Sequence, residues 1–329
     1  MFNTMEKRCQ LALESLGLCQ SGSAISVKRL TGGVASDIAV ISFGHKSVCV
    51  KFALEKLRVE EDWFAPVHRG KTEFNWLSAA GRVVPDAIPK LYGWSDAANG
   101  FAMEYITGPD IVNWKSVLLA GRQDYGESNA VAQVLGRIHA QSTEKGFDRT
   151  MFNSAADFEQ LRTDPYLRFT AQKHPAIAGK LMELANQLSE SEQALVHGDI
   201  SPKNILMRQS QPIILDAECA TMGDPAFDVA FYLNHLLLKS VHLPKSRATF
   251  HAAMQSFWDA YAAHVTWEKT TKIQSRVVQL LPALLLARVD GKSPVEYLSV
   301  NARNSVRDMA IARIISPAST VNEFLEAIV

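Results

Sequence analysis

The spacing of apolar residues changes about one third of the way along this chain, and that change limits the folds open to it. In residues 25–53 and 88–106, β-branched residues alternate with polar ones around glycine-containing turns. Such alternation is typical of antiparallel hairpins. Beyond residue 109 apolar residues recur mainly at helical spacing, as in the long segments 225–264 and 270–315. We therefore expect an α+β fold, with a small β-rich part followed by a larger, mainly α-helical part.

These two parts are expected to form two lobes. Residues 1–106 would make the N-terminal lobe and residues 107–329 the C-terminal lobe, with a hinge at about 103–109. The first lobe should also contain a helix over residues 5–17 and a second helix, KTEFNWLSAA, that stops at Gly81. A cleft between two such lobes is a natural place for a small ligand.

Composition excludes several classes of protein. The 329 residues contain 34 basic and 34 acidic side chains, which leaves no electrostatic footprint of a nucleic-acid binder. The four cysteines are scattered, without a CxxC pair, which argues against a zinc site or a disulfide framework. The N-terminal pattern lacks the continuous apolar core of a signal peptide, and no apolar stretch of roughly 18 residues appears. We expect a cytoplasmic globular protein with no membrane contact.

The segment HGDISPKN and the later segment LDAE carry most of the chemistry. Asp199 follows an apolar strand, and Asn204 comes five residues later. Asp216 ends the apolar run PIIL, with Glu218 two residues further on. Carboxylate and amide oxygens are the ligands that Mg²⁺ prefers, usually together with substrate phosphates. We therefore predict that Asn204, Asp216 and Glu218 hold Mg²⁺ and that Asp199 accepts a proton from an attacking hydroxyl group. A salt bridge would explain Glu218 equally well.

The N-terminal lobe offers residues suited to a nucleotide. The segment LTGGVAS lies between two expected strands, and its glycines allow close backbone approach to an anion. Lys51 ends the strand SVCVK, and Glu73, which is expected to open the following helix, is placed to pair with it. MEYI ends a strand at the hinge, where an adenine ring would bond to the backbone. The candidate nucleotide-binding residues are Gly32, Gly33, Ser36, Lys51, Glu73, Glu104 and Ile106.

In order and spacing these motifs resemble the aminoglycoside phosphotransferase and choline kinase-like superfamily of small-molecule kinases. The strongest likeness lies in LVHGDISPKNIL and ILDAECATMGDPAFDVAFYLNHLL. The resemblance implies a two-lobed, protein-kinase-like fold that transfers the γ-phosphate of ATP, with Mg²⁺, to the hydroxyl of a sugar-like molecule or an amino alcohol. It also implies that Asp199 is the catalytic base and that Lys51 binds the α- and β-phosphates of ATP.

Two further features refine the resemblance. Asp228, in DPAFDVA, is similar to the family's buried Asp that braces the catalytic loop, and His197 is expected to shape that loop. DAE is similar to the D-x-E of choline kinases and methylthioribose kinases. The charged run that follows Lys51 resembles methylthioribose kinase, but SPKN departs from it at Asn204.

Structural explanations compete with some of these roles. His139 is expected to be a hydrogen-bonded core histidine. Arg69 and Trp63 are candidates for substrate contact, but an exposed loop explains them as well. Arg288 and Asp290 are weak candidates for the substrate site. Ser293, Pro294 and Glu296 predict a helix start just after them.

Two other functions remain open alongside kinase activity on a neutral or anionic alcohol. One is phosphorylation of aminoglycosides, which are polycations, although residues 107–329 hold 23 acidic and 22 basic side chains and no acidic surplus. The other is an inactive kinase fold that binds nucleotide or acts as a scaffold. A protein kinase is disfavoured because DPAFDVA begins only eight residues after Asp216, which leaves no long activation segment. A homodimer through the C-terminal helices is compatible with the sequence but not required by it.

Overall fold

The computed structural model describes residues 4–30, 35–58 and 64–326. By their internal contacts the residues divide into two compact units, Met1–Gly108 and Pro109–Val329, here called the N-terminal and C-terminal units. The division falls inside the stretch in which the sequence places the hinge. Each unit is described by itself.

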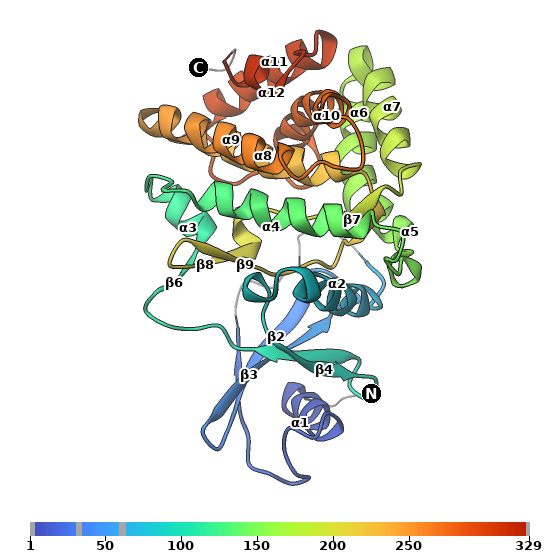
Figure 1. Cartoon of the computed structure of the whole chain (residues 1–329), viewed down its shortest axis with the longest axis vertical. Helices are drawn as coiled ribbons and strands as arrows, with labels where there is room; N and C mark the ends of the chain where they lie inside the picture. Colours follow the sequence, from blue (N-terminus) through green and yellow to red (C-terminus); the bar gives the residue numbers. More distant parts are fainter. Residues whose placement is uncertain (1–3, 31–34, 59–63, 327–329) are drawn as a thin grey trace. The chain divides into compact units, whose positions relative to one another are not determined.

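A five-stranded antiparallel sheet with the order β1-β2-β3-β5-β4 forms the centre of the N-terminal unit (Figure 1). The strands are β1 (Ser26–Arg29), β2 (Ser36–Phe43), β3 (Lys46–Ala53), β4 (Leu91–Ser95) and β5 (Gly100–Glu104). The helices are α1 (Met5–Ser15), α2 (Arg69–Val83) and the short 3₁₀ turn η1 (Pro85–Ala87). The strands that the alternating pattern predicts are therefore all present.

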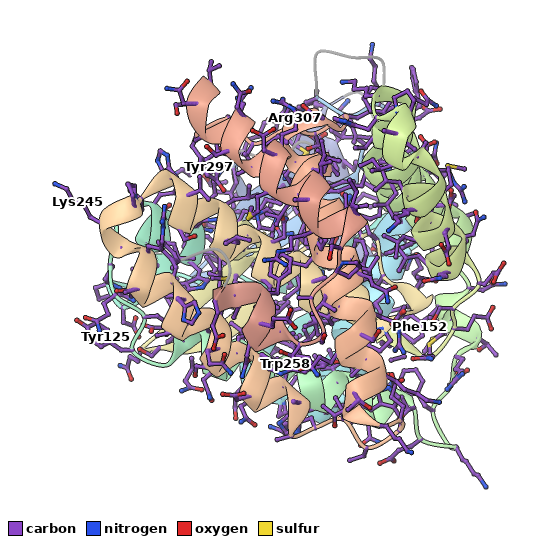
Figure 2. The ribbon with its side chains drawn as sticks, turned by 90° about the horizontal axis from the view of Figure 1, so that it is seen from above. Tyr125, Phe152, Lys245, Trp258, Tyr297 and Arg307 are labelled. Carbon is purple, nitrogen blue, oxygen red and sulfur yellow. The ribbon has the colours of Figure 1, made fainter. Side chains whose placement is uncertain are left out.

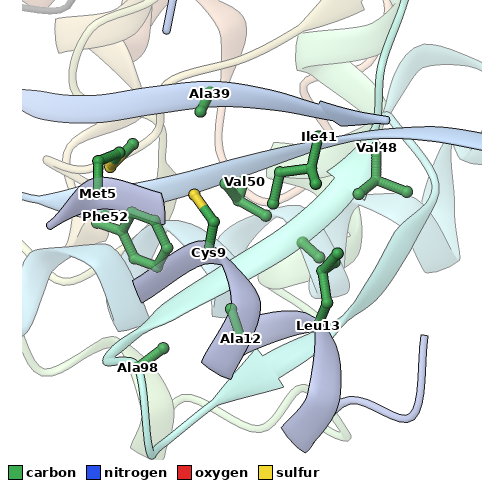
Figure 3. Close-up of a cluster of buried hydrophobic side chains, with 11 residues drawn as sticks. Met5, Cys9, Ala12, Leu13, Ala39, Ile41, Val48, Val50, Phe52 and Ala98 are labelled. Atoms are coloured by element: carbon green, nitrogen blue, oxygen red, sulfur yellow. The ribbon is translucent and has the colours of Figure 1, made fainter. Parts of the chain in front are cut away.

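The two faces of this sheet have different partners. Figure 3 shows Cys9 and Leu13 of α1 gathered with Ile41 of β2 and with Val50 and other residues of β3 in one buried cluster. Because successive side chains of a strand point to opposite faces, the residues between these point away from α1. Lys51 is such a residue, and it meets α2 there. The alternation in SVCVKFA thus directs one charged side chain to the face opposite the α1 cluster.

The C-terminal unit is mainly helical. Its α-helices are α3 (Trp114–Leu119), α4 (Glu127–Ser142), α5 (Ala155–Phe158), α6 (Phe169–Lys173), α7 (Ala178–Ser189), α8 (Pro225–His242), α9 (Arg247–Ala262), α10 (Thr270–Asp290), α11 (Val300–Ile315) and α12 (Val321–Glu326). A π-helical segment, η3 (Glu159–Arg168), and four 3₁₀ turns, η2 (Thr150–Phe152), η4 (Pro175–Ile177), η5 (Pro202–Asn204) and η6 (Pro244–Ser246), connect them.

Helix α8 lies at the core of this unit. It packs against α9 and α10, and α4 packs against α9 (Figure 1). Asp224 caps α8 by accepting from the backbone N–H of Ala226 at 2.9 Å, and Pro225 occupies the first turn. Residues of α8 are buried on every side, as expected for a helix that is apolar all round. No helix in the described ranges is both long and apolar enough to cross a bilayer.

Five short strands carry the segments singled out by their motifs. They are β6 (Ile111–Asn113), β7 (Ala194–Val196), β8 (Ile205–Arg208), β9 (Gln211–Ile214) and β10 (Thr221–Gly223). The order β6-β8-β9 makes one antiparallel sheet, and β10 pairs with β7 in another. HGDISPKN therefore connects β7 to β8, and LDAE follows β9.

Two predicted helix ends are wrong. Helix α2 continues through Gly81 to Val83, since the helical hydrogen bonding does not stop at the glycine. No helix begins at Ser293; α11 begins at Val300, where Ser299 caps it by accepting from Ala302 N–H at 3.2 Å. Arg288 Nη1 donates to both the hydroxyl and the carbonyl of Ser293, so this side chain already has a partner and does not cap a helix.

Candidate functional site

The loop after β7 is held in a tight conformation. Gly198 has a φ of +75°, and a Cβ atom there would lie 2.5 Å from the carbonyl oxygen of Cys219. Only glycine fits this position without moving the chain. The loop that carries Asp199 therefore contacts the segment that carries Glu218 through their backbones.

The Asp228 carboxylate holds the same loop through hydrogen bonds to its backbone. Its Oδ2 accepts from the backbone N–H of His197 at 2.6 Å, and its Oδ1 accepts from that of Gly198 at 2.9 Å. His139, fully buried as expected, lies 3.2 Å from the same carboxylate through Nε2 and 2.8 Å from the Tyr261 hydroxyl through Nδ1. These are the backbone bonds that the family resemblance implies for Asp228.

His197 joins the loop to the strand that precedes Asp216. Its Nδ1 accepts from the backbone N–H of Asp199 at 3.1 Å, so Nε2 carries the hydrogen and donates to the carbonyl of Leu215 at 3.1 Å. Burial lowers the pKa of His197 against the opposing effect of Asp228. A neutral histidine with both nitrogens bonded shapes the loop, which favours the expected supporting role over proton transfer.

The two oxygens of the Asp199 carboxylate differ in their surroundings. Oδ2 lies 2.9 Å from Asn204 Nδ2, 3.0 Å from Arg162 Nη2 and 3.1 Å from Lys203 Nζ. Oδ1 accepts no hydrogen bond from any residue that the structure describes. Oδ2 is thus held by one hydrogen bond and two ion pairs, and Oδ1 is left for a group from outside the chain.

Charge around Asp199 keeps it ionised. Burial alone would raise the pKa of Asp199, and Asp216 acts in the same direction. Lys203 and Arg162 outweigh these effects, and the pKa of Asp199 lies below its ordinary value. The group is a well-oriented but weak base, suited to accept a proton late in a reaction.

Asn204 presents an oxygen to the same region. Its Nδ2 donates to both the carbonyl and the carboxylate of Asp199, at 2.9 Å each. The amide oxygen Oδ1 of Asn204 therefore stays available as a ligand. No described residue donates a hydrogen bond to that oxygen. Leu215 N–H bonds to the Asn204 carbonyl at 2.9 Å, which holds the turn η5 against the end of β9.

Asp216 follows β9 with a φ of +69°, a left-handed conformation that few residues other than glycine adopt. It acts electrostatically on Asp199 and on His197, as expected for a neighbour of both. Glu218 is buried and acts on Arg162. In the described residues, no three His, Cys, Asp or Glu side chains form a metal cluster. Mg²⁺ fits the site nonetheless, because it needs only one or two protein oxygens besides phosphates and water.

The N-terminal unit contains the predicted pair of Lys51 and Glu73. Lys51 Nζ lies 2.8 Å from Oε1 and 2.7 Å from Oε2 of Glu73, and both side chains are almost wholly buried. Glu73 is the fifth residue of α2 rather than its first. A buried ion pair of this kind holds an ammonium group in one place.

The other residues predicted to bind the nucleotide have fewer side-chain contacts that indicate a role. Ser36 is buried at the start of β2, and Glu104 ends β5, where it accepts from Lys90 N–H at 3.3 Å. Ile106 is half-buried just beyond β5. Gly32 and Gly33 lie outside the described residues, as does Trp63.

Arg69 is not in an exposed loop. It is fully buried and donates to the backbone carbonyls of Ala65, Pro66, Ala35 and Leu54. These bonds tie the start of α2 to the segments on either side of β2 and β3. The position of Arg69 is therefore structural.

The two weak substrate candidates have different surroundings. Asp290 bonds to Arg307 through both oxygens at 2.7 Å and to His174 at 2.8 Å, so its carboxylate is occupied by the neighbouring helices. Arg288 donates through Nη1 to Ser293 and to the Tyr166 hydroxyl, the latter at 3.3 Å, while its buried Nε has no partner in the described part of the chain.

Sequence reasoning missed two cations beside Asp199. Lys203 lies inside the HGDISPKN motif and could have been noticed from its position four residues after Asp199. Arg162 gave no such signal, because it comes from η3, which holds Pro165 inside an irregular helix. Arg162 also donates from Nε to the Gly198 carbonyl at 2.5 Å, so it supports both the loop and the carboxylate.

Comparison with known proteins places the chain in a family. Residues 26–264 match the sequence model of a family described as the phosphotransferase enzyme family. The chain is 23% identical over 249 residues to methylthioribose kinase 1 of Oryza sativa subsp. japonica, covering 65% of this chain and 56% of that protein. It is 25% identical over 247 residues to the methylthioribose kinase of Escherichia coli O45:K1, covering 64% and 57%. The chain thus spans little more than half the length of these two relatives.

Solved structures show the same fold at lower identity. A Plasmodium vivax ethanolamine kinase matches with a TM-score of 0.57 and 11% identity, covering 95% of this chain and 91% of that one. An amicoumacin kinase solved with AMP-PNP, Ca²⁺ and Ami matches with a TM-score of 0.55 and 14% identity, covering 92% and 91%. The expected α+β, two-lobed kinase-like fold is confirmed.

Proposed function

Because the chain belongs to the phosphotransferase enzyme family, we propose that it transfers the γ-phosphoryl group of ATP to a hydroxyl group of a small molecule. The observation that carries this proposal is that the two oxygens of the Asp199 carboxylate have different surroundings. Oδ2 is held by one hydrogen bond and two ion pairs, and Oδ1 accepts no hydrogen bond from the described residues. That is the arrangement needed to orient an acceptor hydroxyl and to take its proton.

The proposed reaction forms one bond at the γ-phosphorus and breaks another. The acceptor oxygen forms a bond to the γ-phosphorus, the bond from that phosphorus to the bridging oxygen breaks, and its electron pair leaves on ADP. The hydroxyl proton passes to Asp199 Oδ1. Because the pKa of Asp199 is lowered, the proton moves late, and orientation of the hydroxyl supplies most of the effect of Asp199.

Other residues bind and position the nucleotide. Lys51, held by Glu73, would bind the α- and β-phosphates, as the strand lysine of kinases does. Asn204 Oδ1 and Asp216 would hold Mg²⁺, with Glu218 near enough in the chain to join them. When bound, Mg²⁺ neutralises charge on the phosphate oxygens.

The test is a screen of alcohols with ATP and Mg²⁺, read by ADP release above the rate without acceptor. Acceptors should include methylthioribose, choline, ethanolamine and aminoglycosides, since similar proteins carry those names. Asp199→Asn keeps the size of the side chain but removes the base, and we expect turnover to fall by roughly 10²- to 10⁴-fold while ATP binding persists. ATP binding without transfer to any alcohol would instead favour a nucleotide-binding scaffold, and wild-type turnover in Asp199→Asn would exclude Asp199 as the base.

A further inference from the structure

A group of cationic side chains lies in the C-terminal unit, beyond the residues that the proposed reaction uses. We call it the basic cluster, and it consists of the cations Lys115, Lys239 and Arg288 together with the buried His235, whose pKa burial lowers well below its ordinary value. His235 and Lys239 lie one turn apart on α8, Arg288 lies near the end of α10, and Lys115 belongs to α3. After burial itself, Arg288, Lys239, Lys203 and Lys115 all lower the pKa of His235, so the cations of the cluster, together with Lys203 beside Asp199, lie within electrostatic reach of one side chain.

Lys239 is the least compensated of these cations. It is only 1% exposed, yet the hydrogen bond its ammonium makes is to the His235 carbonyl, at 3.3 Å. No carboxylate in the described ranges lies within ion-pairing distance of Lys239 or Arg288. The nearby acid, Glu296, bonds instead to Lys115 at 2.6 Å. A buried cation without an anionic partner is costly, so an anion supplied from outside would stabilise it.

Unused donors surround the same position. Arg288 Nε is buried and has no partner among the described residues, and the same holds for the hydroxyl of Tyr297. The Lys239 ammonium lies 5.6 Å from the centre of the Tyr297 ring. Tyr297, labelled in Figure 2, lies on the segment between α10 and α11. A guanidinium N–H, a phenol O–H and an ammonium group can together bind the oxygens of one anion.

A layer of aromatic rings connects the basic cluster to the candidate base. The Arg162 guanidinium, bonded to Asp199, lies 6.0 Å from the Tyr166 ring and 5.9 Å from the Phe231 ring. The same two rings contact the basic cluster, because Arg288 donates to the Tyr166 hydroxyl at 3.3 Å and His235 meets Phe231 edge to face at 5.0 Å. Tyr166 and Phe231 therefore contact both the cation that pairs with Asp199 and members of the cluster.

We propose that the acceptor alcohol carries an anionic group, a carboxylate or a phosphate monoester, which Arg288, Lys239 and Tyr297 bind while its hydroxyl faces Asp199. This inference rests on the proposed function and names the class of its substrate. A cationic acceptor would meet Arg288, Lys239 and Lys115 with repulsion, whereas an anion is attracted by all three. Binding of an anion also favours the protonated form of Lys239, whose pKa is lowered to about 7 by burial and by its cationic neighbours.

The first experiment tests anion binding without turnover. ADP with Mg²⁺ is added at saturation, its own binding is measured by calorimetry, and inorganic phosphate is then titrated in at pH 7. Variants Arg288→Gln and Lys239→Met remove a charge from the basic cluster. Lys245→Met is the matched control, because Lys245 is an exposed lysine just beyond the same helix (Figure 2). Circular dichroism confirms that each variant is folded.

We expect phosphate to bind the wild type and Lys245→Met alike, and at least tenfold more weakly to Arg288→Gln and Lys239→Met. Absence of phosphate binding in the wild type, or equal binding by all four proteins, would overturn the proposal. Failure of ADP to bind would count against the proposed function instead, so the two failures are distinguishable.

The second experiment compares three-carbon alcohols that carry an anionic, a neutral or a cationic group. These are glycerate, glycerol 3-phosphate, glycerol and 3-amino-1,2-propanediol, and the binding of each is measured by calorimetry with ADP and Mg²⁺ at saturation. We expect one of the two anions to bind at least tenfold more tightly than glycerol, and the amine to bind no better than glycerol. Whichever of glycerate and glycerol 3-phosphate binds more tightly shows whether the site prefers a carboxylate or a phosphate group. Preference for the amine would contradict the proposal.

Discussion

Arg162 contacts Asp199 and the residue next to it at the same time. Its Nη2 lies 3.0 Å from Asp199 Oδ2, and its Nε donates to the Gly198 carbonyl. Burial alone would lower the pKa of this guanidinium, but Cys219 and Asp199 outweigh burial, and the pKa lies above its ordinary value. One side chain thus controls both the charge and the position of the proposed base.

Replacing Arg162 with Met should make Asp199 easier to protonate. The cations at Oδ2 lower the pKa of Asp199, so losing one of them raises that pKa. A base works only when it is deprotonated, and the acid limb of the pH profile of kcat/KM should therefore move to higher pH. Arg162→Lys keeps the positive charge and should shift the acid limb of this profile less. Equal acid limbs in the wild type and Arg162→Met would show that Asp199 does not titrate in this profile.

Replacing Asp228 with Asn should destabilise the fold. The carboxylate is fully buried and accepts from two backbone N–H groups and from His139. An amide offers one accepting oxygen, and its NH₂ group would face a donor, at a cost of about 1–3 kcal/mol per unsatisfied group. Urea unfolding measures the loss in the free energy of unfolding. Asp259→Asn, on the exposed side of α9, is the control and should change little.

Much of the candidate site could be predicted from sequence because its residues are close together in the chain. Asp199 and Asn204 share one loop, so spacing alone brings their side chains within hydrogen-bonding distance. The pair of Lys51 and Glu73 follows from strand alternation and a helix packed on one face of the sheet. The resemblance supplied the brace from Asp228, which spacing alone would not reveal.

The parts that could not be predicted depend on distant contacts. Arg162 reaches Asp199 from a π-helical segment whose geometry leaves no periodic signal. The strands β6 and β10 have three residues each and exist because β8 and β7 pair with them. The expected cap at Ser293 fails because Arg288, from the preceding helix, takes the oxygens of that residue.

The pair of Lys51 and Glu73 allows stability to be separated from function. Lys51→Met leaves the Glu73 carboxylate buried without this partner, and we expect a loss of about 3–5 kcal/mol in the free energy of unfolding. The double variant Lys51→Met/Glu73→Leu removes both charges and should recover most of that stability. ADP release should remain low in both, since neither has an ammonium for the phosphates. Wild-type kinetics in the double variant would rule out a role for Lys51 in nucleotide use.

The pH dependence of stability should reveal Lys239. Burial lowers its pKa in the folded chain to about 7, followed in effect by Lys115 and Arg288, while an unfolded chain leaves it near 10.4. Between these two values the unfolded chain binds more protons, so the contribution of Lys239 to the free energy of unfolding rises with pH and falls as pH drops toward 7. Three pKa units correspond to about 4 kcal/mol at most.

The variant Lys239→Met should lose this dependence of the free energy of unfolding on pH. In urea unfolding it should therefore be more stable than the wild type by the largest amount near pH 7 and by little near pH 10. Inorganic phosphate should reduce this difference in stability at pH 7, because a bound anion stabilises the protonated lysine of the wild type. Parallel stability curves for the two proteins would mean that Lys239 keeps an ordinary pKa in the folded chain, and that its ammonium is already neutralised there.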